Sequence, residues 1–578
     1  MHNIVYVLLR RIHVPLIVLV CVYSISVLGF VLIPGVDNQG KPWDMGFFHA
    51  FYFVSFLGTT IGLGEIPYPF TDAQRLWATI SIYGTVLAWL YGIGTALSLL
   101  QDPPFQSVLR MNAFRRAVNL ISEPFYLVCG YGDTGSTLVR ALSEAGYRSV
   151  VIELDQSRII ALELEDLGMP VPGLCANAAE PEILVMAGMM RSNCIGVIAL
   201  TNVDAVNLNV AITAKLLRPR LDTTARAESR SVEANMLSFG TDQVLNPFDT
   251  FAGRLALALH SPGMFLLYEW MTAVPHEPLR EPLFPPHGRW ILCGYGRFGK
   301  AVYERLLAED VQVTVIEAMP DITNAPPGTI SGSGAEAVTL LEAGIKDAVG
   351  IVAGTDNDAN NLSIIMTARE LNPDLFMVAR QNQHQNSIIF KAAKLDLTMK
   401  RGTVIANKIF ALTTTPLLAD FLQAARQNSN VWANQLVSRI GGISGDEVPQ
   451  TWTLEITPAA APALYAGIAR GRRASISDLC RDPRNRNECL PCMALLIKRG
   501  NAEILLPADD EKLQRGDHIL LCGRFGAGQQ MEWIAKNHNV FDYLYSGEER
   551  ASGSVWRWLT REKDHKASVE NSTLGKPS

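Results

Sequence analysis

The sequence has few charged residues and no excess of basic ones. Charged residues make up 18% of its 578 positions, against about 25% in an average soluble protein. The 50 basic and 56 acidic residues leave a net charge of −6, so the basic footprint of a nucleic-acid-binding protein is missing. Because the net charge is small and 48% of residues are hydrophobic, intrinsic disorder is excluded for most of the chain.

Cysteine is also scarce, with nine residues, which excludes a disulfide-stabilised scaffold. Cys21 lies in an apolar run and the others show no paired spacing, so we expect the polar part of the chain in a reducing compartment. Cys480, Cys489 and Cys492 cluster in a polar insertion that contains no histidine. Three thiolates fall one ligand short of a closed structural zinc site, so metal or redox sensing and plain loop thiols both remain open.

Two long uncharged runs stand near the N-terminus, at 14–33 and 76–101. Twenty helical residues cover about 30 Å, the thickness of a bilayer's hydrocarbon core. A signal peptide fits the first run poorly, because the run is longer than a signal h-region and no small-residue cleavage site follows it. Arg10 and Arg11 precede this run and arginines at 110–116 follow the second, which places both termini in the cytoplasm.

A third uncharged run, 45–64, ends in Gly58-Thr59-Thr60-Ile61-Gly62-Leu63-Gly64-Glu65. Alternating glycines break a helix but permit an extended backbone with unusual dihedral angles. Such backbone is tolerated at membrane depth only where it lines protein or water. Aromatic residues precede it in an amphipathic segment: Phe47, Phe48, Phe51, Tyr52 and Phe56. This order predicts a short re-entrant helix followed by an extended loop.

These residues resemble the pore of the potassium-channel superfamily, whose filter pattern is T-V-G-Y-G-D with a proline shortly after. The match runs over Thr60, Ile61, Gly62, Leu63 and Gly64. The resemblance implies that four chains present rings of backbone carbonyls that replace the hydration shell of K⁺. It also implies that the threonine hydroxyl closes the inner site and that the two glycines supply the unusual dihedral angles. A glycine-rich loop in a two-helix membrane anchor is the alternative.

The loop departs from the family pattern at two positions. Leu63 replaces the tyrosine, and Glu65 replaces the aspartate at the outer pore mouth, which leaves the degree of selectivity for K⁺ over Na⁺ open. Gly84, in the second apolar run, stands 20 residues after Gly64. The resemblance implies a gating hinge near this position, and a glycine that serves helix packing is the alternative.

The larger part of the chain is an internal repeat. Residues 126–135 recur at 290–299, an offset of 164, and Thr201, Asn207 and Arg226 match Thr355, Asn361 and Arg380 at an offset of 154. A repeat of this length is a domain duplication. Each copy begins with an apolar strand, then G-x-G-x-x-G, then a helix with apolar residues at helical spacing, which predicts a parallel, doubly wound sheet.

Each copy carries a dinucleotide-type fingerprint. The glycines let a pyrophosphate approach the backbone at a helix N-terminus, and an acidic residue 18 positions after the last glycine would accept bonds from the ribose hydroxyls. The predicted nucleotide-binding residues are Gly130, Gly132, Gly135 and Glu153 in the first copy, and Gly294, Gly296, Gly299 and Glu317 in the second. A Rossmann core that keeps its glycines for packing and binds nothing is the alternative.

The two copies resemble RCK (TrkA-N-like) domains, the regulators of potassium conductance. A further apolar helix is expected at 404–427, of the kind with which RCK domains cross to a partner domain; a core helix is the alternative. The predicted organisation is a two-helix pore domain at 1–103, a linker at 104–122, Rossmann-like RCK domains at 123–260 and 289–435, a Pro-rich linker at 261–288 with one short helix at Met264–Ala273, an α+β C-terminal RCK-like subdomain at 448–525, and a disordered tail at 546–578.

The whole pattern resembles bacterial two-transmembrane potassium channels with tandem RCK domains. The resemblance implies a multi-pass homotetramer in the lipid bilayer of the plasma (inner) membrane, with K⁺ as the permeant ion and a cytoplasmic ring of RCK domains. A nucleotide such as NAD(H), ADP or ATP is the first choice of regulatory ligand and Ca²⁺ the second. Asp509, Asp510 and Glu511 could offer oxygen ligands, but a solvated acidic turn fits this unspaced run better.

Two other functions fit part of the sequence. A membrane-anchored NAD-dependent oxidoreductase would need an acid or base near the nicotinamide, and no convincing His–Asp or Lys–Tyr constellation follows either fingerprint. It would also leave the filter pattern unexplained, so we expect no enzymatic activity. A non-conducting regulatory subunit of a potassium transporter would share the RCK domains. The sequence holds no arginine-rich voltage-sensor helix.

Overall fold

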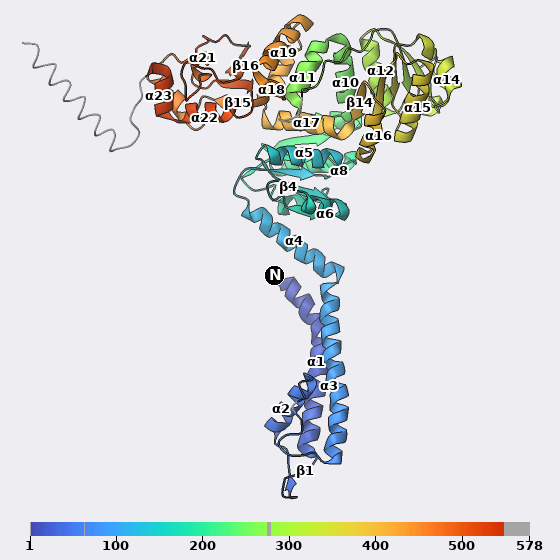
Figure 1. Cartoon of the computed structure of the whole chain (residues 1–578), viewed down its shortest axis with the longest axis vertical. Helices are drawn as coiled ribbons and strands as arrows, with labels where there is room; N and C mark the ends of the chain where they lie inside the picture. Colours follow the sequence, from blue (N-terminus) through green and yellow to red (C-terminus); the bar gives the residue numbers. More distant parts are fainter. Residues whose placement is uncertain (1, 63, 274–278, 548–578) are drawn as a thin grey trace, which may run out of the picture. The chain divides into compact units, whose positions relative to one another are not determined.

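The computed structural model describes residues 2–62, 64–273 and 279–547 (Figure 1). The predicted filter residue Leu63 and nearly all of the predicted tail lie outside the described residues. The chain forms two compact units, Met1–Leu120 and Ile121–Ser578, and each unit has its own core.

The first unit consists of helices joined by short irregular segments. Its elements are α1 (His2–Leu32), β1 (Gly35–Val36), β2 (Pro42–Trp43), α2 (Phe47–Gly58), α3 (Asp72–Leu100) and α4 (Pro103–Leu120). Apolar stretches of α1 and α3, His13–Leu32 and Asp72–Ser98, are long enough to cross a bilayer. Only 22% and 17% of these stretches are buried, so they are not the core helices of a soluble domain. Helix α4 occupies most of the predicted linker.

Aromatic packing holds the short helix α2 against the long helices. Phe30 of α1 lies 4.9 Å from Phe53 of α2, measured between ring centroids, and Phe53 lies 4.8 Å from Phe70. Such edge-on contacts add to the burial of the rings. The backbone leaves the helix after Gly58 and takes positive φ angles at Thr60, Gly62 and Gly64. The short helix followed by irregular glycine backbone is confirmed, whereas the re-entrant pore stays a prediction.

The first copy of the repeat is a six-stranded parallel sheet in the order β5-β4-β3-β6-β7-β8. Its central strand is buried at every position because helices cover both faces. The strands are β3 (Phe125–Cys129), β4 (Arg148–Glu153), β5 (Gly173–Cys175), β6 (Cys194–Ala199), β7 (Asp222–Arg226) and β8 (Gln243–Leu245). The helices are α5 (Asp133–Glu144), α6 (Gln156–Leu164), α7 (Pro181–Met186), α8 (Asp204–Leu217), α9 (Arg230–Ser238) and α10 (Pro247–His260).

The second copy repeats this topology, with the strand order β11-β10-β9-β12-β13-β14. The predicted doubly wound parallel sheet is therefore confirmed in both copies. The strands are β9 (Arg289–Cys293), β10 (Gln312–Glu317), β11 (Ile330–Ser331), β12 (Gly350–Ala353), β13 (Phe376–Gln381) and β14 (Leu397–Lys400). The helical segments are α12 (Arg297–Ala308), α13 (Pro320–Thr323), α14 (Ala337–Glu342), η1 (Ile345–Asp347), α15 (Asp358–Leu371), η2 (His384–Asn386), α16 (Ser387–Ala392) and α17 (Arg401–Thr414).

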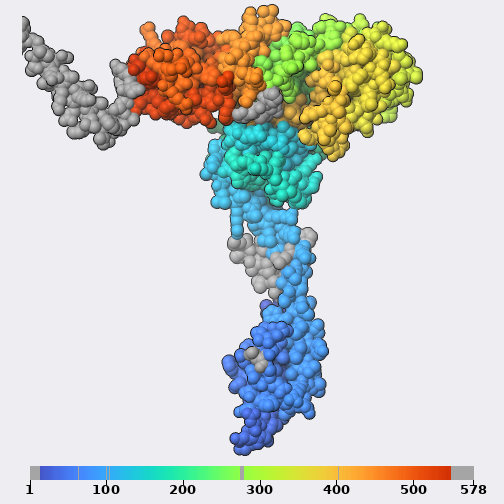
Figure 2. Space-filling view, in the orientation of Figure 1, coloured from blue at the N-terminus to red at the C-terminus, as the bar shows by residue number. Residues whose placement is uncertain are grey.

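The two copies exchange their last helices. On α17, Ile405 and Ile409 share a core with Leu138 of α5 in the first copy. On α10, Phe251 shares a core with Trp290 of the second copy. Figure 1 shows α17 (orange) beside α5 (teal), and Figure 2 shows the first copy in contact with orange segments of the same unit. The predicted crossing helix is thus confirmed, with the other copy of the same chain as its partner.

The helix expected at 404–427 is in fact two helices. Helix α17 ends at Thr414 and α18 (Leu417–Ala425) begins after Pro416. Proline lacks a backbone N–H and disfavours helical backbone in the residue before it, so the first helix ends before Pro416.

The Pro-rich stretch after α10 begins with a helix, α11 (Pro262–Thr272), that is longer than the short helix expected there. Ser261 caps it and Pro262 occupies its first turn, both of which favour a helix start. All its residues after Pro262 are buried, and it packs on α19 (Asn430–Ser444). This part of the predicted linker therefore contributes to the core.

A smaller α+β subdomain follows, built on a four-stranded antiparallel sheet in the order β15-β18-β16-β17. Its helices α22 and α23 extend past the predicted end at 525, and the predicted tail begins inside a helix, because α23 ends at Ser546. The elements are β15 (Gln450–Glu455), α20 (Pro462–Ala469), α21 (Ile476–Leu479), β16 (Cys492–Arg499), β17 (Ala502–Leu505), β18 (His518–Gly523), α22 (Ala527–Lys536) and α23 (His538–Ser546).

Candidate functional site

The glycine turn after β3 has no room for side chains. A Cβ on Gly135 would lie 2.0 Å from the Gly130 carbonyl oxygen, and one on Gly130 would lie 2.9 Å from the Thr201 nitrogen. Gly130 also has a φ of 104°, which side chains resist. Gly132 begins α5 without any side-chain cap. The first backbone N–H groups of α5 therefore remain available to an anion.

The acidic residue at the end of the second strand has backbone partners in both copies. The Glu153 carboxylate accepts N–H bonds from Tyr131 at 2.5 Å and Asp155 at 3.0 Å. Glu317 accepts the equivalent bonds at the same distances from Tyr295 and Met319. Each carboxylate therefore ties the glycine turn to the end of the neighbouring strand. A carboxylate oxygen can accept more than one bond, so the predicted ribose contact stays a prediction.

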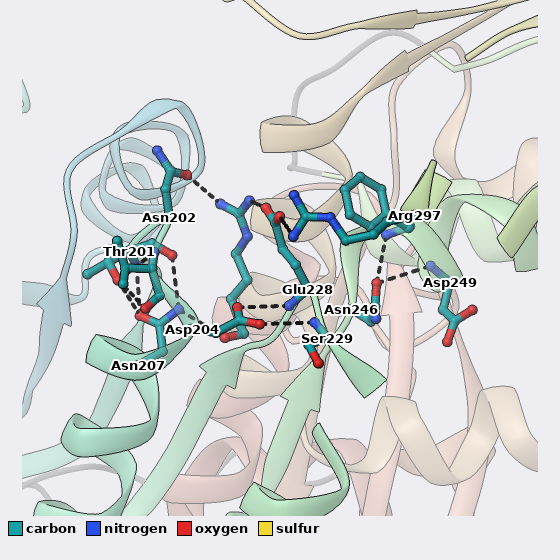
Figure 3. Close-up of polar contacts among 12 residues, drawn as sticks. Thr201, Asn202, Asp204, Asn207, Glu228, Ser229, Asn246, Asp249 and Arg297 are labelled. Carbon is teal, nitrogen blue, oxygen red and sulfur yellow. Dashed lines mark hydrogen bonds and ion pairs between the residues drawn. The ribbon is translucent and has the colours of Figure 1, made fainter. Parts of the chain in front are cut away.

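An asparagine fixes the loop that faces each glycine turn. Asn207 accepts from the Thr201 N–H at 2.9 Å and donates to the Arg226 carbonyl at 2.9 Å (Figure 3). Asn361 accepts from the Thr355 N–H at 2.9 Å and donates to the Arg380 carbonyl at 2.8 Å. The sequence repeat pairs these residues without revealing their role, which depends on bonds between successive strands.

A cleft of about 760 Å³ lies over the first glycine turn. The first copy contributes Gly130, Gly132 and Glu153, and the second copy contributes 381–385, Lys400, Gly402 and Thr403. Because the second copy closes one side, a ligand in this cleft would contact both copies. This composite wall could not be recognised from the fingerprint alone.

Arg158 of α6 adds a positive charge to this cleft. One of its terminal nitrogens lies 2.9 Å from where a Cβ on Gly132 would stand, and 3.9 Å from the Glu153 carboxylate. The guanidinium thus lies beside the turn where a phosphate would meet the start of α5, and arginine suits phosphate geometry. The position of Arg158 in the repeat is occupied in the second copy by Ile322.

The matching place in the second copy is filled by a phenylalanine. At the first cleft, Gly402 of the second copy lies against α5. A Cβ on Gly402 would be 3.0 Å from Cβ of Asp133. Phe248 of the first copy occupies the position equivalent to Gly402, and it is only 2% exposed. Its ring lies 6.3 Å from Phe298 and 5.2 Å from the Arg380 guanidinium. A cavity of about 260 Å³ remains beside it.

An ion pair between the copies borders the phenylalanine. Arg297, at the position of Asp133 in the repeat, reaches Glu228 of the first copy at 2.7 Å and lies over the Phe248 ring at 5.5 Å (Figure 3). Glu228 is also paired with the buried Arg226. Asn382 stands at the position of Glu228 in the second copy and donates to Asp358, so the first cleft has a neutral amide where the second has a carboxylate.

Two of the predicted pore residues, Glu65 and Gly84, contact or belong to α3. The Glu65 carboxylate accepts from the Phe70 N–H at 2.8 Å and pairs with Arg75 at 2.9 Å, which ties the loop to α3. A Cβ on Gly84 would lie 3.3 Å from Val22 of α1. Gly84 thus lies in a close contact between α1 and α3, and its role as a hinge stays a prediction.

The cysteine cluster and the acidic turn lie in the C-terminal subdomain. Cys480 is buried and Cys489 is exposed, and a hydrogen bond with Cys492 together with burial raises the pKa of Cys480. Glu511 of the acidic turn pairs with Arg499 at 3.2 Å. Within residues 2–62, 64–273 and 279–547, no group of three or more His, Cys, Asp or Glu side chains is arranged to hold a metal ion.

Comparison with known families and curated proteins agrees with this architecture. The TrkA-N domain profile matches residues 126–247 and 290–400, one segment in each copy. Potassium channel protein 1 of Methanocaldococcus jannaschii is 25% identical over 296 residues, which cover 50% of this chain and 84% of that protein. Probable potassium channel protein 2 of the same organism is 28% identical over 140 residues, 23% of this chain and 41% of that protein.

Solved structures show a weaker overall similarity. The GsuK channel bound to NAD aligns with 92% of this chain and 99% of its own length, at 17% identity and a TM-score of 0.42. A TM-score below 0.5 does not establish a common arrangement of all parts. The profile matches and the curated relatives nevertheless agree on the kind of domain. The chain therefore carries two TrkA-N (RCK) domains, and half of it is similar to a potassium channel protein.

Proposed function

We propose that the chain is the subunit of a potassium channel regulated by a nucleotide in the first TrkA-N cleft. The observation that carries this proposal is the cleft of about 760 Å³ over the first glycine turn, walled by both copies. A ligand that contacts both copies favours the arrangement in which it binds best, and only such differential binding can shift a conformational equilibrium.

The chemistry of the cleft fits an adenine nucleotide such as NAD(H), ADP or ATP. A phosphate would accept bonds from the uncapped start of α5 and from Arg158. Ribose hydroxyls would donate to Glu153, which lines the same cleft. We propose that the nucleotide acts there as a regulator and not as a substrate.

The pore assignment rests on α1, α3 and the glycine loop between them. Two apolar helices, a short helix with an aromatic core, and positive φ angles at Thr60, Gly62 and Gly64 occur in that order. We propose that four chains assemble in a plasma membrane around this loop with their TrkA-N domains in the cytoplasm, and that the carbonyls from Thr60 onward coordinate K⁺. The homology to potassium channel proteins supports this choice of ion.

Flux from liposomes loaded with K⁺ tests the proposal. Purified full-length protein should release K⁺, and NAD or ADP should change the rate. Gly62→Ala should abolish flux, because its φ of 67° is strained for alanine, while nucleotide binding persists. Absence of flux under every nucleotide, or hydride transfer from NADH to a substrate, would overturn it.

A further inference from the structure

A second hollow of the C-terminal unit lies away from both glycine turns, where the exchanged helices α10 and α17 approach each other. Its volume is about 450 Å³, and residues of α9, α10, α11, α12 and α17 line it together with Arg426, which follows α18. Apart from one histidine, four of the lining side chains can carry a positive charge: Arg254, Arg305, Lys408 and Arg426.

Three of these cations take part in none of the ion pairs found among the described residues. Among the described residues, no carboxylate lies within 4.0 Å of Arg305, Lys408 or Arg426 in the ion pairs of the structure. Arg254 differs, because it pairs with the buried Glu269. Arg426 lies over the ring of Tyr268 at 5.9 Å, which leaves its hydrogen-bond donors unused by that contact.

Three carboxylates also line the hollow, and two of them contact basic side chains other than these four cations. Asp249 pairs with Arg230 at 3.5 Å, and Glu309 pairs with His260 at 3.2 Å. Glu233 is the remaining carboxylate: burial raises its pKa, while a hydrogen bond with Asn246 opposes that shift. Four arginine and lysine side chains thus line the hollow against three carboxylates.

Among the cations of the hollow, Lys408 has a lowered pKa. Burial, followed by the positive charges of Arg426 and Arg254, lowers its pKa to about 8, and the nearby Glu233 carboxylate opposes this shift. Like charges that converge on a partly buried hollow repel each other, and an anion placed between them would relieve both the repulsion and the lost hydration. Lys408 also occupies the position of Arg254 in the repeat, so each exchanged helix supplies one cation to the same hollow.

We propose that this hollow is a binding site for a small multivalent anion of the phosphate or pyrophosphate class. Arginine side chains would bind two phosphate oxygens at once, and Lys408 would add a third positive charge. Since α10 and α17 come from different copies, the bound anion would hold the two TrkA-N domains together independently of a nucleotide in the first cleft.

Calorimetric titration of the full-length protein with pyrophosphate tests the site. The titration is done in an Arg158→Gln background, so that binding beside the first glycine turn is weakened. Lys408→Met and Arg426→Gln should each weaken pyrophosphate binding at least tenfold. Lys346→Met, on the surface segment η1 outside the hollow, is the matched control and should leave it unchanged.

A pH comparison with sulfate, which does not titrate near neutrality, gives a second readout. Lys408 is charged below its pKa of about 8, so sulfate should bind more tightly at pH 7 than at pH 9, and Lys408→Met should remove this difference. Arg254, Arg426 and Glu233 face Lys408, and the arginines keep their charge over this range. Equal pyrophosphate affinity in the Lys408→Met, Arg426→Gln and Lys346→Met proteins, or a pH dependence that survives Lys408→Met, would overturn the proposal.

Discussion

The two TrkA-N copies share one backbone framework but differ in whether the cleft is open. The asparagine bonds and the glutamate bonds to the glycine turn agree within 0.1 Å between copies. The differences lie in side chains at three equivalent places, Asp133 and Arg297, Thr134 and Phe298, and Gly402 and Phe248. After duplication, the same framework has kept one cleft open and filled the other with aromatic and cationic side chains.

The filled copy illustrates how a binding cleft can become a packing surface. Phe248 is buried against Phe298 and Arg380, and the Arg297–Glu228 pair connects the two copies at its edge. The second copy in turn supplies 381–385, Lys400, Gly402 and Thr403 to the open cleft. We infer that one copy binds the nucleotide and the other provides both a wall of that site and a stable partner.

The largest expected effect comes from copying the filling side chain into the open cleft. Gly402→Phe should lower nucleotide affinity at least a hundredfold, about 2.7 kcal/mol, because even a Cβ there meets Asp133 at 3.0 Å. Calorimetry with ADP measures it. Gly442→Phe, on α19 where a Cβ has open space, should bind normally. Full ADP affinity in Gly402→Phe would show that the ligand lies elsewhere.

The reverse exchange should open the second copy. Phe248→Gly with Arg297→Asp removes the buried ring and the ion pair to Glu228, and the lost packing should cost about 3–5 kcal/mol of stability. The number of ADP molecules bound per chain, measured by equilibrium dialysis at high concentration, should rise from one toward two. An unchanged number in a folded double variant would mean that another feature closes the second cleft.

A smaller effect is expected at Arg158, a cation of the first cleft that Ile322 replaces in the second copy. Arg158→Gln should weaken ADP binding about tenfold, because one charge-assisted bond to phosphate is lost. Adenosine, which lacks phosphate, should bind the variant and the unaltered protein equally well. An equal loss for ADP and adenosine would assign Arg158 to the fold of the turn.

The smallest difference between the copies is expected when Asn207 and Asn361 are each replaced. Asn207→Ala and Asn361→Ala each remove bonds that join successive strands, and each should cost about 1–3 kcal/mol. Thermal unfolding in detergent should show similar losses for both variants, whereas only Asn207→Ala should weaken ADP binding. Clearly unequal losses of stability would indicate that the two asparagines stabilise their copies to different extents, although their hydrogen bonds have similar lengths.

The sequence predicted the framework better than the site. Repeat spacing, the glycine turns and the acidic residues depend on local pattern, so the parallel sheets and the crossing helix could be expected. The filling of the second cleft could not, because Phe248 meets Phe298 and Arg380 only after the helices are exchanged. The expected helix at Met264–Ala273 is found as α11, which begins two residues earlier, and the same residue type has opposite effects at two places, since Pro262 begins a helix while Pro416 interrupts one.

The most direct test asks whether occupancy of one cleft per chain controls K⁺ flux. Nucleotide binding and K⁺ release are measured on the same proteoliposomes across one ADP titration, repeated with NAD. For at least one of the two nucleotides, half of the change in flux should coincide with half-saturation of a single site per chain. Flux that stays constant while this site fills, or that follows a second site in each chain, would contradict this expectation.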